Sequence, residues 1–458
     1  MFVKSALVEI ARKVGMDGAI AYSSAARIFQ AIAGVVSVFI IATFLNGSEQ
    51  GYFFTFNSIL AIQIFFELGF TGIMTQYVAH EAVHLNLNNA YYYEGENRYK
   101  SRLAYLVRLC LKWYGLIALL FLIVIVIVGL AYFGRYASPD ENVNWQAPWY
   151  LLSFSTAVKL FQSPFTAIYT GLGKVKEMNK ITFFQQLIIP ISQWVLFACG
   201  LKLFVVGISS MLGVIVWWIY VFKTGLWRIL FNLLKERITE TISYMKEIFP
   251  YQWKIALSWI SGYFIFQFFN PVLFATEGSV VAGQMGMTVQ VLSAIQSFAL
   301  SWQNTKIPRY CGFIEMEQYD ALDCLFNKTL RQMIVVCIAI LILFYVVIFF
   351  LRTTSFAIGN TVFADRFLDY IPMLLMTVPV IVNQFVSSWA TYLRCHKQEP
   401  FLVNSICMGA LCCVSTLLFG KYFGLYGITI GYASLCLFIS LPWGFYIFKT
   451  KKIEWHGR

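Results

Sequence analysis

Long apolar runs recur along almost the whole chain, and they limit the possible fold more than any other feature. Each run has about 20 residues, the length that an α-helix needs to cross roughly 30 Å of hydrocarbon. The composition agrees, because 59% of the residues are hydrophobic, 12% are charged and the mean hydropathy is +0.69. The sequence therefore predicts an all-α, polytopic membrane protein with about 12 transmembrane helices. The expected spans are 19–45, 51–79, 112–133, 149–169, 181–199, 203–222, 251–275, 281–303, 330–351, 370–393, 401–419 and 425–448.

Basic residues gather on one side of the predicted membrane. Most of the 34 Lys and Arg residues fall in alternate short loops, which the positive-inside rule assigns to the cytoplasm. We therefore expect a multi-pass protein with cytoplasmic N- and C-termini. The +12 charge reflects this topology and attraction to lipid surfaces, and it does not indicate a nucleic-acid partner.

The two halves of the chain contain an internal echo. Ala61-Ile62-Gln63, in the second predicted span, returns about half a chain later as Ala294-Ile295-Gln296, in the second span of the other half. Gly51 and Gly283 correspond in the same way. Such repeats are typical of transporters built from two pseudo-symmetric lobes, with the substrate path at the interface between them.

The echo and the order of the spans predict the domain organisation. We expect two six-helix bundles, an N-terminal lobe at 19–223 and a C-terminal lobe at 251–458, joined by a cytoplasmic linker at 224–250. Residues 1–18 carry apolar side chains at helical spacing and are expected to form an amphipathic helix on the inner membrane surface.

Charged residues inside spans are candidates for function, because a charge in the bilayer is costly unless it faces a cavity or a partner. Arg27 and Lys159 lie within the first and fourth spans, and Glu67 is the one carboxylate well inside any predicted span. The excess of cations predicts an anionic cargo such as a pyrophosphate, with Glu67 as a coupling group or charge partner. Further basic candidates are Lys254, Lys306 and Arg309. Their long side chains could instead extend along the helix and place their charges at the inner membrane interface.

Three tryptophans lie near these basic residues in the sequence and could stack on sugar rings. They are Trp253, Trp259 and Trp302. Tryptophan also forms belts at membrane interfaces, so that both roles stay open for them.

The segment 76–87 contains the pattern H-E-x-x-H, which on a helix can present two zinc-binding histidines on one face. The residues are His80, Glu81 and His84. A catalytic zinc needs a third ligand and an open position for water, and the remaining histidines, His396 and His456, do not continue the motif. We therefore expect a polar helix end here, with no metal and no cofactor.

Four short stretches give the chain a family resemblance. "GSEQGYFFTF", "FFELGF" and "QYVAHE" in the first half, and "SWQNTKIP" in the second, resemble the polysaccharide and O-antigen flippases. These form one branch of the multidrug/oligosaccharidyl-lipid/polysaccharide exporter superfamily. The resemblance implies two six-helix bundles around a cationic cavity that binds an undecaprenyl-pyrophosphate-linked glycan. It also implies alternating access in the bacterial cytoplasmic (inner) membrane.

The resemblance suggests roles for particular residues and partners. It makes Arg27, Lys159 and Lys254 ligands for the pyrophosphate and sugars. It implies a lipid-linked oligosaccharide substrate, contact with membrane lipids, and cooperation with a polysaccharide polymerase or chain-length machinery. The product would be O-antigen, part of lipopolysaccharide, or another surface polysaccharide.

Three other functions compete with this one. A purely structural scaffold is possible, but it would not explain Arg27, Lys159 and Glu67. A multidrug or cation antiporter of the same superfamily usually carries an acidic residue in its first span, where this chain has Arg27. A membrane-bound polymerase or glycosyltransferase needs a sizeable outer loop with catalytic residues, but the longest outer segments, 134–148 and 352–369, are short. We therefore expect translocation without chemistry, and no enzyme activity.

Overall fold

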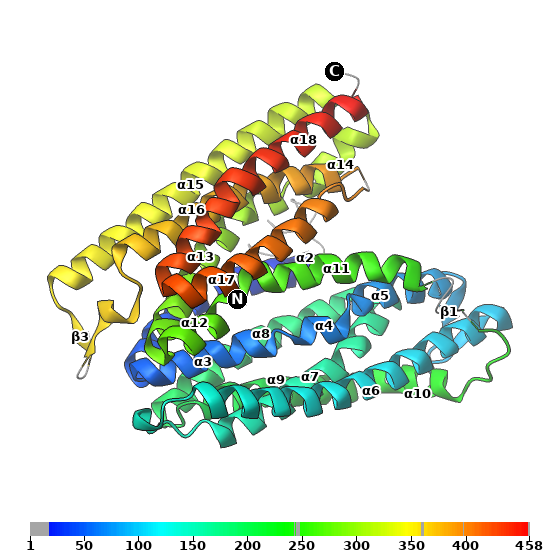
Figure 1. Ribbon diagram of the computed structural model, residues 1–458. Helices are drawn as coiled ribbons and strands as arrows, with labels where there is room; N and C mark the ends of the chain where they lie inside the picture. The colour runs from blue at the N-terminus through cyan, green and yellow to red at the C-terminus, as the bar shows by residue number, and fades with distance from the viewer. Residues whose placement is uncertain (1–17, 242, 244–247, 359–360, 397, 457–458) are drawn as a thin grey trace, which may run out of the picture. The chain divides into compact units, whose positions relative to one another are not determined.

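The computed structural model describes residues 18–458 except 242, 244–247, 359–360, 397 and 457–458 (Figure 1). Nearly all of the amphipathic helix expected at 1–18 lies outside the described residues. The side chains of Arg27 and Lys254 lie outside them as well, although the backbone at both positions is helical.

Helices dominate the described chain, and the only strands among these residues form two short hairpins. In the first half the elements are α2 (Gly18–Phe44), α3 (Gly47–Leu60), α4 (Gln63–Glu67), α5 (Phe70–Ala82), β1 (Leu85–Leu87), β2 (Tyr93–Gly95), α6 (Asn97–Tyr136), η1 (Pro139–Glu141), α7 (Gln146–Gly171), α8 (Val175–Ala198), α9 (Phe204–Lys223) and α10 (Leu226–Lys235). In the second half they are α11 (Phe249–Phe266), α12 (Phe269–Glu277), α13 (Ser279–Asn304), α14 (Ile307–Glu315), α15 (Tyr319–Thr353), β3 (Ala357–Ile358), β4 (Thr361–Val362), η3 (Phe363–Arg366), α16 (Tyr370–Arg394), α17 (Leu402–Leu435), η4 (Cys436–Ser440) and α18 (Leu441–His456).

Within the described parts of the chain, eight helical segments are long and apolar enough to cross a membrane. The last of them, Leu402–His456, has 55 residues and turns at Gly424, whose φ of 55° interrupts the helix, so that it supplies two spans. Helices α2, α7 and α13 have 26 or 27 residues each, or about 39 Å at 1.5 Å per residue. The prediction of an all-α polytopic membrane protein is therefore confirmed.

The chain forms two compact units that do not follow the sequence order. Unit 1 comprises Met1–Ala33, Ile62–Gly134 and Asn144–Ala256, and unit 2 comprises Gly34–Ala61, Arg135–Val143 and Leu257–Arg458. Three of the boundaries fall inside predicted spans. The lobes expected at 19–223 and 251–458, with a linker at 224–250, stay a prediction.

In unit 1, helix α7 packs against α5 and α9, and α8 packs against α9. Close approach depends on small residues, as is usual between membrane helices. A Cβ atom added at Gly129 would lie 2.1 Å from the indole of Trp149, and one at Gly171 would lie 2.7 Å from the carbonyl oxygen of Thr75.

In unit 2, helix α13 packs along α3 and also contacts α12, α15 and α16. The two glycines of the internal echo meet at the α3–α13 crossing, where a Cβ atom on Gly283 would lie 2.8 Å from the amide nitrogen of Gly51. The buried Gln50 fixes this contact by donating from Nε2 to the carbonyl oxygen of Gly283 at 2.8 Å. Gly51 and Gly283 therefore lie together within unit 2, while the two pseudo-symmetric lobes that the echo predicts stay a prediction.

The second span is broken, although its sequence is apolar throughout. Helix α3 ends at Leu60, α4 covers only Gln63–Glu67, and α5 begins at Phe70. Leu68 and Gly69 between α4 and α5 are left-handed, with φ of 50° and 68°. A non-glycine residue rarely adopts this conformation, which points to tertiary contacts that hold the break in place.

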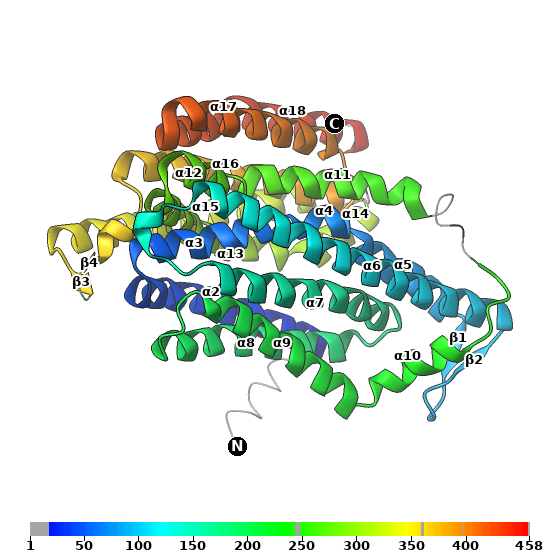
Figure 2. The same ribbon diagram turned by 60° about the horizontal axis from the view of Figure 1, so that its bottom comes forward.

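Between the spans, unit 1 carries a small assembly of connecting segments at one end of α6. Strands β1 and β2 pair antiparallel, with Leu85 opposite Gly95, and α10 follows α9 through the left-handed Gly225. Figure 2 shows α10 next to this hairpin, and Asn232 of α10 donates a hydrogen bond to the carbonyl oxygen of Tyr91 between the two strands. The predicted linker at 224–250 therefore contains a helix.

Candidate functional site

Unit 2 contains a cavity of about 460 Å³ between the helices α3, α12, α13, α16 and α17. None of its lining residues in the described part of the chain is Asp, Glu, Lys, Arg or His. Six of them carry a carboxamide, namely Asn57, Gln267, Asn270, Gln290, Gln296 and Asn383. The cavity is therefore polar but uncharged, an arrangement that serves hydrogen bonding without binding a counter-ion.

A break in the seventh span shapes this cavity. Helix α11 ends at Phe266 and α12 begins at Phe269, and both Gln267 and Asn270 beside the break line the cavity. Interrupted helices are tolerated at membrane depth where they border a cavity, and in transporters they mark binding sites.

Several of the carboxamides are available to a ligand. Asn270 donates from Nδ2 to Ser58 Oγ at 3.3 Å, and Asn57 donates to the carbonyl oxygen of Phe53 in its own helix at 2.8 Å. Among the described residues, the side chains of Gln267 and Gln290 have no hydrogen-bond partner. Each therefore offers a donor and an acceptor to whatever enters the cavity.

Aromatic rings supply the apolar part of the lining. Phe53 and Phe54 meet edge to face with centroids 5.2 Å apart, and the rings of Phe269 and Tyr432 are 4.8 Å apart. Rings beside paired donors and acceptors suit a ligand that has both hydroxyl groups and apolar C–H faces. Sugars have this combination.

Unit 1 holds a second polar feature at the break in span 2. Glu67, the last residue of α4, accepts a hydrogen bond from Thr71 Oγ1 in α5 across the break. Thr71 Oγ1 also lies 2.8 Å from Tyr114 Oη in α6 and 2.9 Å from Ser163 Oγ in α7, and Ser163 donates to Glu67 Oε1 at 3.3 Å. Hydroxyl groups from three helices therefore stabilise the predicted intramembrane carboxylate.

Replacing Thr71 by Val should weaken unit 1. The change removes the hydroxyl that joins Glu67 to Tyr114 and Ser163, and a hydrogen bond to a charged group is worth about 1.5–3 kcal/mol. We expect a clearly lower melting temperature of the purified protein in detergent. Thr170→Val is the matched control, because among the described residues the Thr170 hydroxyl bonds only to the carbonyl oxygen of Thr166 in its own helix. Equal effects of both variants would contradict a bridging role for Thr71.

Of the predicted cationic residues, the three with described side chains, Lys159, Lys306 and Arg309, do not line the cavity of unit 2. Lys159 is exposed on α7, one turn before Ser163, while Lys306 is half-buried before α14 and Arg309 is exposed within it. The structure leaves the side chains of Arg27 and Lys254 undescribed. A role for these five residues in binding an anion stays a prediction.

The three predicted sugar-stacking residues lie outside the cavity too. Trp253 and Trp259 are exposed on α11, and Trp302 near the end of α13 packs against Phe298 with centroids 5.5 Å apart. Their role in sugar binding also stays a prediction.

The H-E-x-x-H segment has a structural role in the described fold. Helix α5 ends at Ala82, so that His84 lies beyond the helix that carries His80. Glu81 is buried and pairs with Arg102 at 2.9 Å, and His84 stacks on Tyr99 with ring centroids 4.1 Å apart. The group that a metalloprotease would use as its general base is thus engaged in an ion pair.

The sequence analysis considered charged residues within spans and therefore did not identify the carboxamides of the cavity. A signal for them exists in the sequence, since the seventh span reads "FQFFNP" at 266–271, where Gln267 and Asn270 interrupt an apolar run before a proline. Polar amides beside a proline within a span indicate a broken helix that borders a cavity.

No known protein family and no curated protein matches the sequence. The fold, however, resembles solved structures. The lipid II flippase MurJ, in an inward closed conformation, has a TM-score of 0.61 at 14% identity, over 94% of this chain and 88% of that chain. A multidrug resistance MATE family transporter of the MOP superfamily, in its inward-facing conformation, has a TM-score of 0.54 at 12% identity, over 92% of this chain and 99% of that chain. The chain therefore has the same fold as these two solved structures.

Proposed function

We propose that this protein is a flippase that moves a lipid-linked oligosaccharide across the bacterial cytoplasmic membrane by alternating access. The cargo is an undecaprenyl-pyrophosphate-linked repeat unit of O-antigen or another surface polysaccharide. One observation carries this choice of cargo. Among the described residues, the cavity of unit 2 is lined by six carboxamides and several aromatic rings and by no charged side chain.

The lining favours a sugar over a cationic drug. Gln267 and Gln290 can each donate to and accept from hydroxyl groups, and the neighbouring rings can cover apolar sugar faces. A drug cation would be desolvated here without a carboxylate to offset the cost. The fold alone does not decide, because it is shared with a multidrug transporter and with the lipid II flippase.

The charged end of the cargo needs a different set of residues. We assign the pyrophosphate to the cations Arg27, Lys159 and Lys254, with Lys306 and Arg309 at the predicted inner end of the eighth span. Arg27 offers a planar fork of donors and the lysines offer point charges, which together suit a diphosphate.

A complementation experiment tests this function. We expect the chain, produced in a bacterial strain without its own flippase, to restore surface polysaccharide and to prevent inward-facing lipid-linked repeat units from accumulating. A second strain without its drug exporters should gain no drug resistance from the chain. Drug resistance without restored polysaccharide would contradict the flippase and favour the antiporter.

The same strain can be used to distinguish a flippase from an enzyme that synthesises the glycan. A polymerase or glycosyltransferase would change the length of the lipid-linked glycan on the inner side of the membrane, whereas a flippase changes only the side on which it is found. Electrophoresis of the extracted lipid-linked glycans measures this difference. A change in glycan length without transfer would overturn the proposal.

A further inference from the structure

Helix α10, which follows the sixth span, has two apolar faces. One face packs into unit 1 through Leu226, Ile229, Leu230 and Leu233, which are all at most 6% exposed. This face accounts for the stability of the helix. The side chains of the second apolar face are much more exposed.

The second face carries three apolar side chains at helical spacing. Trp227, Phe231 and Leu234 are 37%, 48% and 36% exposed, and their separations of four and three residues align them on one side of the helix. A helix that only linked two domains in water would place polar residues here. We call these three residues, together with Arg228 and Lys235, the outer face of α10.

The outer face continues an aromatic row from the preceding span. Ring centroids are 5.9 Å apart for Trp218 and Phe222, 6.3 Å for Phe222 and Trp227, and 6.1 Å for Trp227 and Phe231. Phe222, at the end of α9, is 57% exposed, as expected for a side chain that faces lipid. The row therefore joins α10 to the surface of a membrane-spanning helix.

Two cations border the aromatic row. Arg228 and Lys235 are both exposed, and the Lys235 ammonium lies 4.1 Å from the centroid of Phe231. The Arg228 guanidinium lies 5.8 Å from the rings of both Trp227 and Tyr91. Within the described part of the chain neither cation forms an ion pair, so that both remain able to bind an anion.

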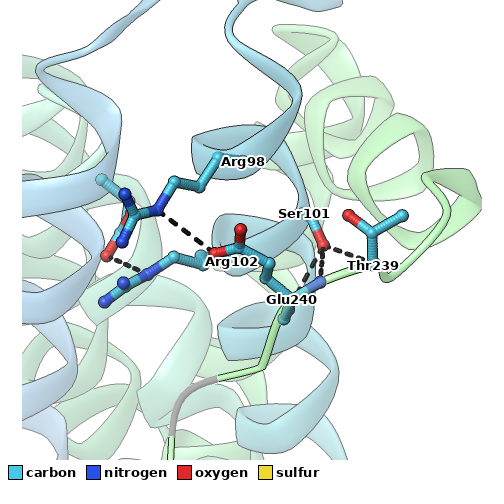
Figure 3. Close-up of polar contacts among 6 residues, drawn as sticks. Arg98, Ser101, Arg102, Thr239 and Glu240 are labelled. Atoms are coloured by element: carbon cyan, nitrogen blue, oxygen red, sulfur yellow. Dashed lines mark hydrogen bonds and ion pairs between the residues drawn. The ribbon is translucent and has the colours of Figure 1, made fainter.

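Polar contacts with α6 and the hairpin hold this helix in place. Arg108 donates from Nη2 to the carbonyl oxygen of Leu234 at 2.7 Å, and Asn232 donates to the carbonyl oxygen of Tyr91 at 2.9 Å. Beyond the helix, Ser101 Oγ accepts from the amides of Thr239 and Glu240 at 2.7 and 2.9 Å (Figure 3). The outer face is thus fixed before any ligand binds, which lowers the entropic cost of binding.

We propose that the outer face of α10 lies in the headgroup layer of the membrane and binds the phosphate groups of anionic phospholipids. Trp227, Phe231 and Leu234 enter the boundary between headgroups and acyl chains, and Arg228 and Lys235 contact the phosphates. The amphipathic character, the aromatic row that continues from α9 and the unpaired cations all match a helix lying in the membrane interface. This inference does not depend on the nature of the transported cargo.

Photo-crosslinking in intact membranes tests the position of the face. Phe231→p-benzoylphenylalanine in the full chain should give an adduct with phospholipid on illumination, detected by mass spectrometry of the purified protein. The neighbouring residue supplies the control, because Asn232 faces Tyr91 of the hairpin. Asn232→p-benzoylphenylalanine should crosslink within the protein. A protein adduct at 231, or no more lipid at 231 than at 232, would overturn the proposal.

A charge test addresses the headgroup. Native mass spectrometry of the purified protein with added phosphatidylglycerol should show about 30-fold weaker binding for Arg228→Gln combined with Lys235→Gln, the factor for two cations at ~1 kcal/mol each. Phosphatidylcholine binding should not change. The control is Lys328→Gln with Arg331→Gln, an exposed pair on α15 that undergoes the same change of charge. An equal loss in both double variants would show that net charge alone governs binding and would refute a site on α10.

Discussion

Gly51→Ala is expected to leave little folded protein in the membrane. A Cβ atom at this position would lie 1.9 Å from the carbonyl oxygen of Ser279, so that the backbones of α3 and α13 would have to move apart. Overpacking a closely packed contact typically costs 1–3 kcal/mol, and a clash between two backbones belongs at about the upper end. Separation would also lengthen the hydrogen bond from Gln50 to Gly283.

The matched control is Gly72→Ala in α5. A Cβ atom there meets nothing within 4 Å, and alanine favours a helix over glycine by up to about 1 kcal/mol. We therefore expect this variant to be as stable as the parent or slightly more stable. Fluorescence-detected size-exclusion chromatography after heating measures both proteins in detergent. A normal melting temperature for Gly51→Ala would contradict the close α3–α13 contact.

Gln267→Leu combined with Gln290→Leu is expected to reduce glycan export strongly while the protein stays folded. Leucine is close to glutamine in size, and neither amide has a protein partner among the described residues, so that the main loss is hydrogen bonding to the cargo. Two such bonds at about 1.4 kcal/mol each correspond to an affinity about 100-fold lower.

Surface polysaccharide in the complemented strain, divided by the amount of the variant in the membrane, measures this effect. Gln76→Leu is the control, because Gln76 is exposed on α5 in unit 1 and does not line the cavity. It should export normally. Full export by the double variant at normal membrane levels would remove the cavity of unit 2 from the transport path.

The order and approximate position of the spans could be predicted from sequence, because hydrophobic length is a property of single segments. Helices α6 and α15 nevertheless begin 15 and 11 residues before the predicted spans at 112–133 and 330–351. Helix breaks could not be predicted in the same way. The break at Leu68 and Gly69 lies in an apolar run, and the contacts that hold it come from α6 and α7, distant in the sequence. Hydropathy depends on which residues are present and not on their backbone dihedral angles, so that it gives no sign of this break.

The candidate site shows a related difference. A carboxylate inside a span is costly unless it has partners, and this cost identified Glu67 as a candidate in the sequence. In the structure, the hydroxyl groups of Thr71 and Ser163 are its partners. The same reasoning passed over Gln290 and Asn383, because a carboxamide costs far less to bury than an ion. These residues come together only because α13 packs against α16. This contact cannot be inferred from the sequence of either helix alone.

The division into units has a consequence for experiments with gene fragments. The chain passes between units within α2, after Ala61 and within α11, so that a cut in the connection after Glu240 would not release two self-contained pieces. The first fragment would carry α3, including the buried Tyr52 and Phe56, without the α13 that covers it. We expect either fragment alone to be degraded, and the two to accumulate only when they are produced in the same cell.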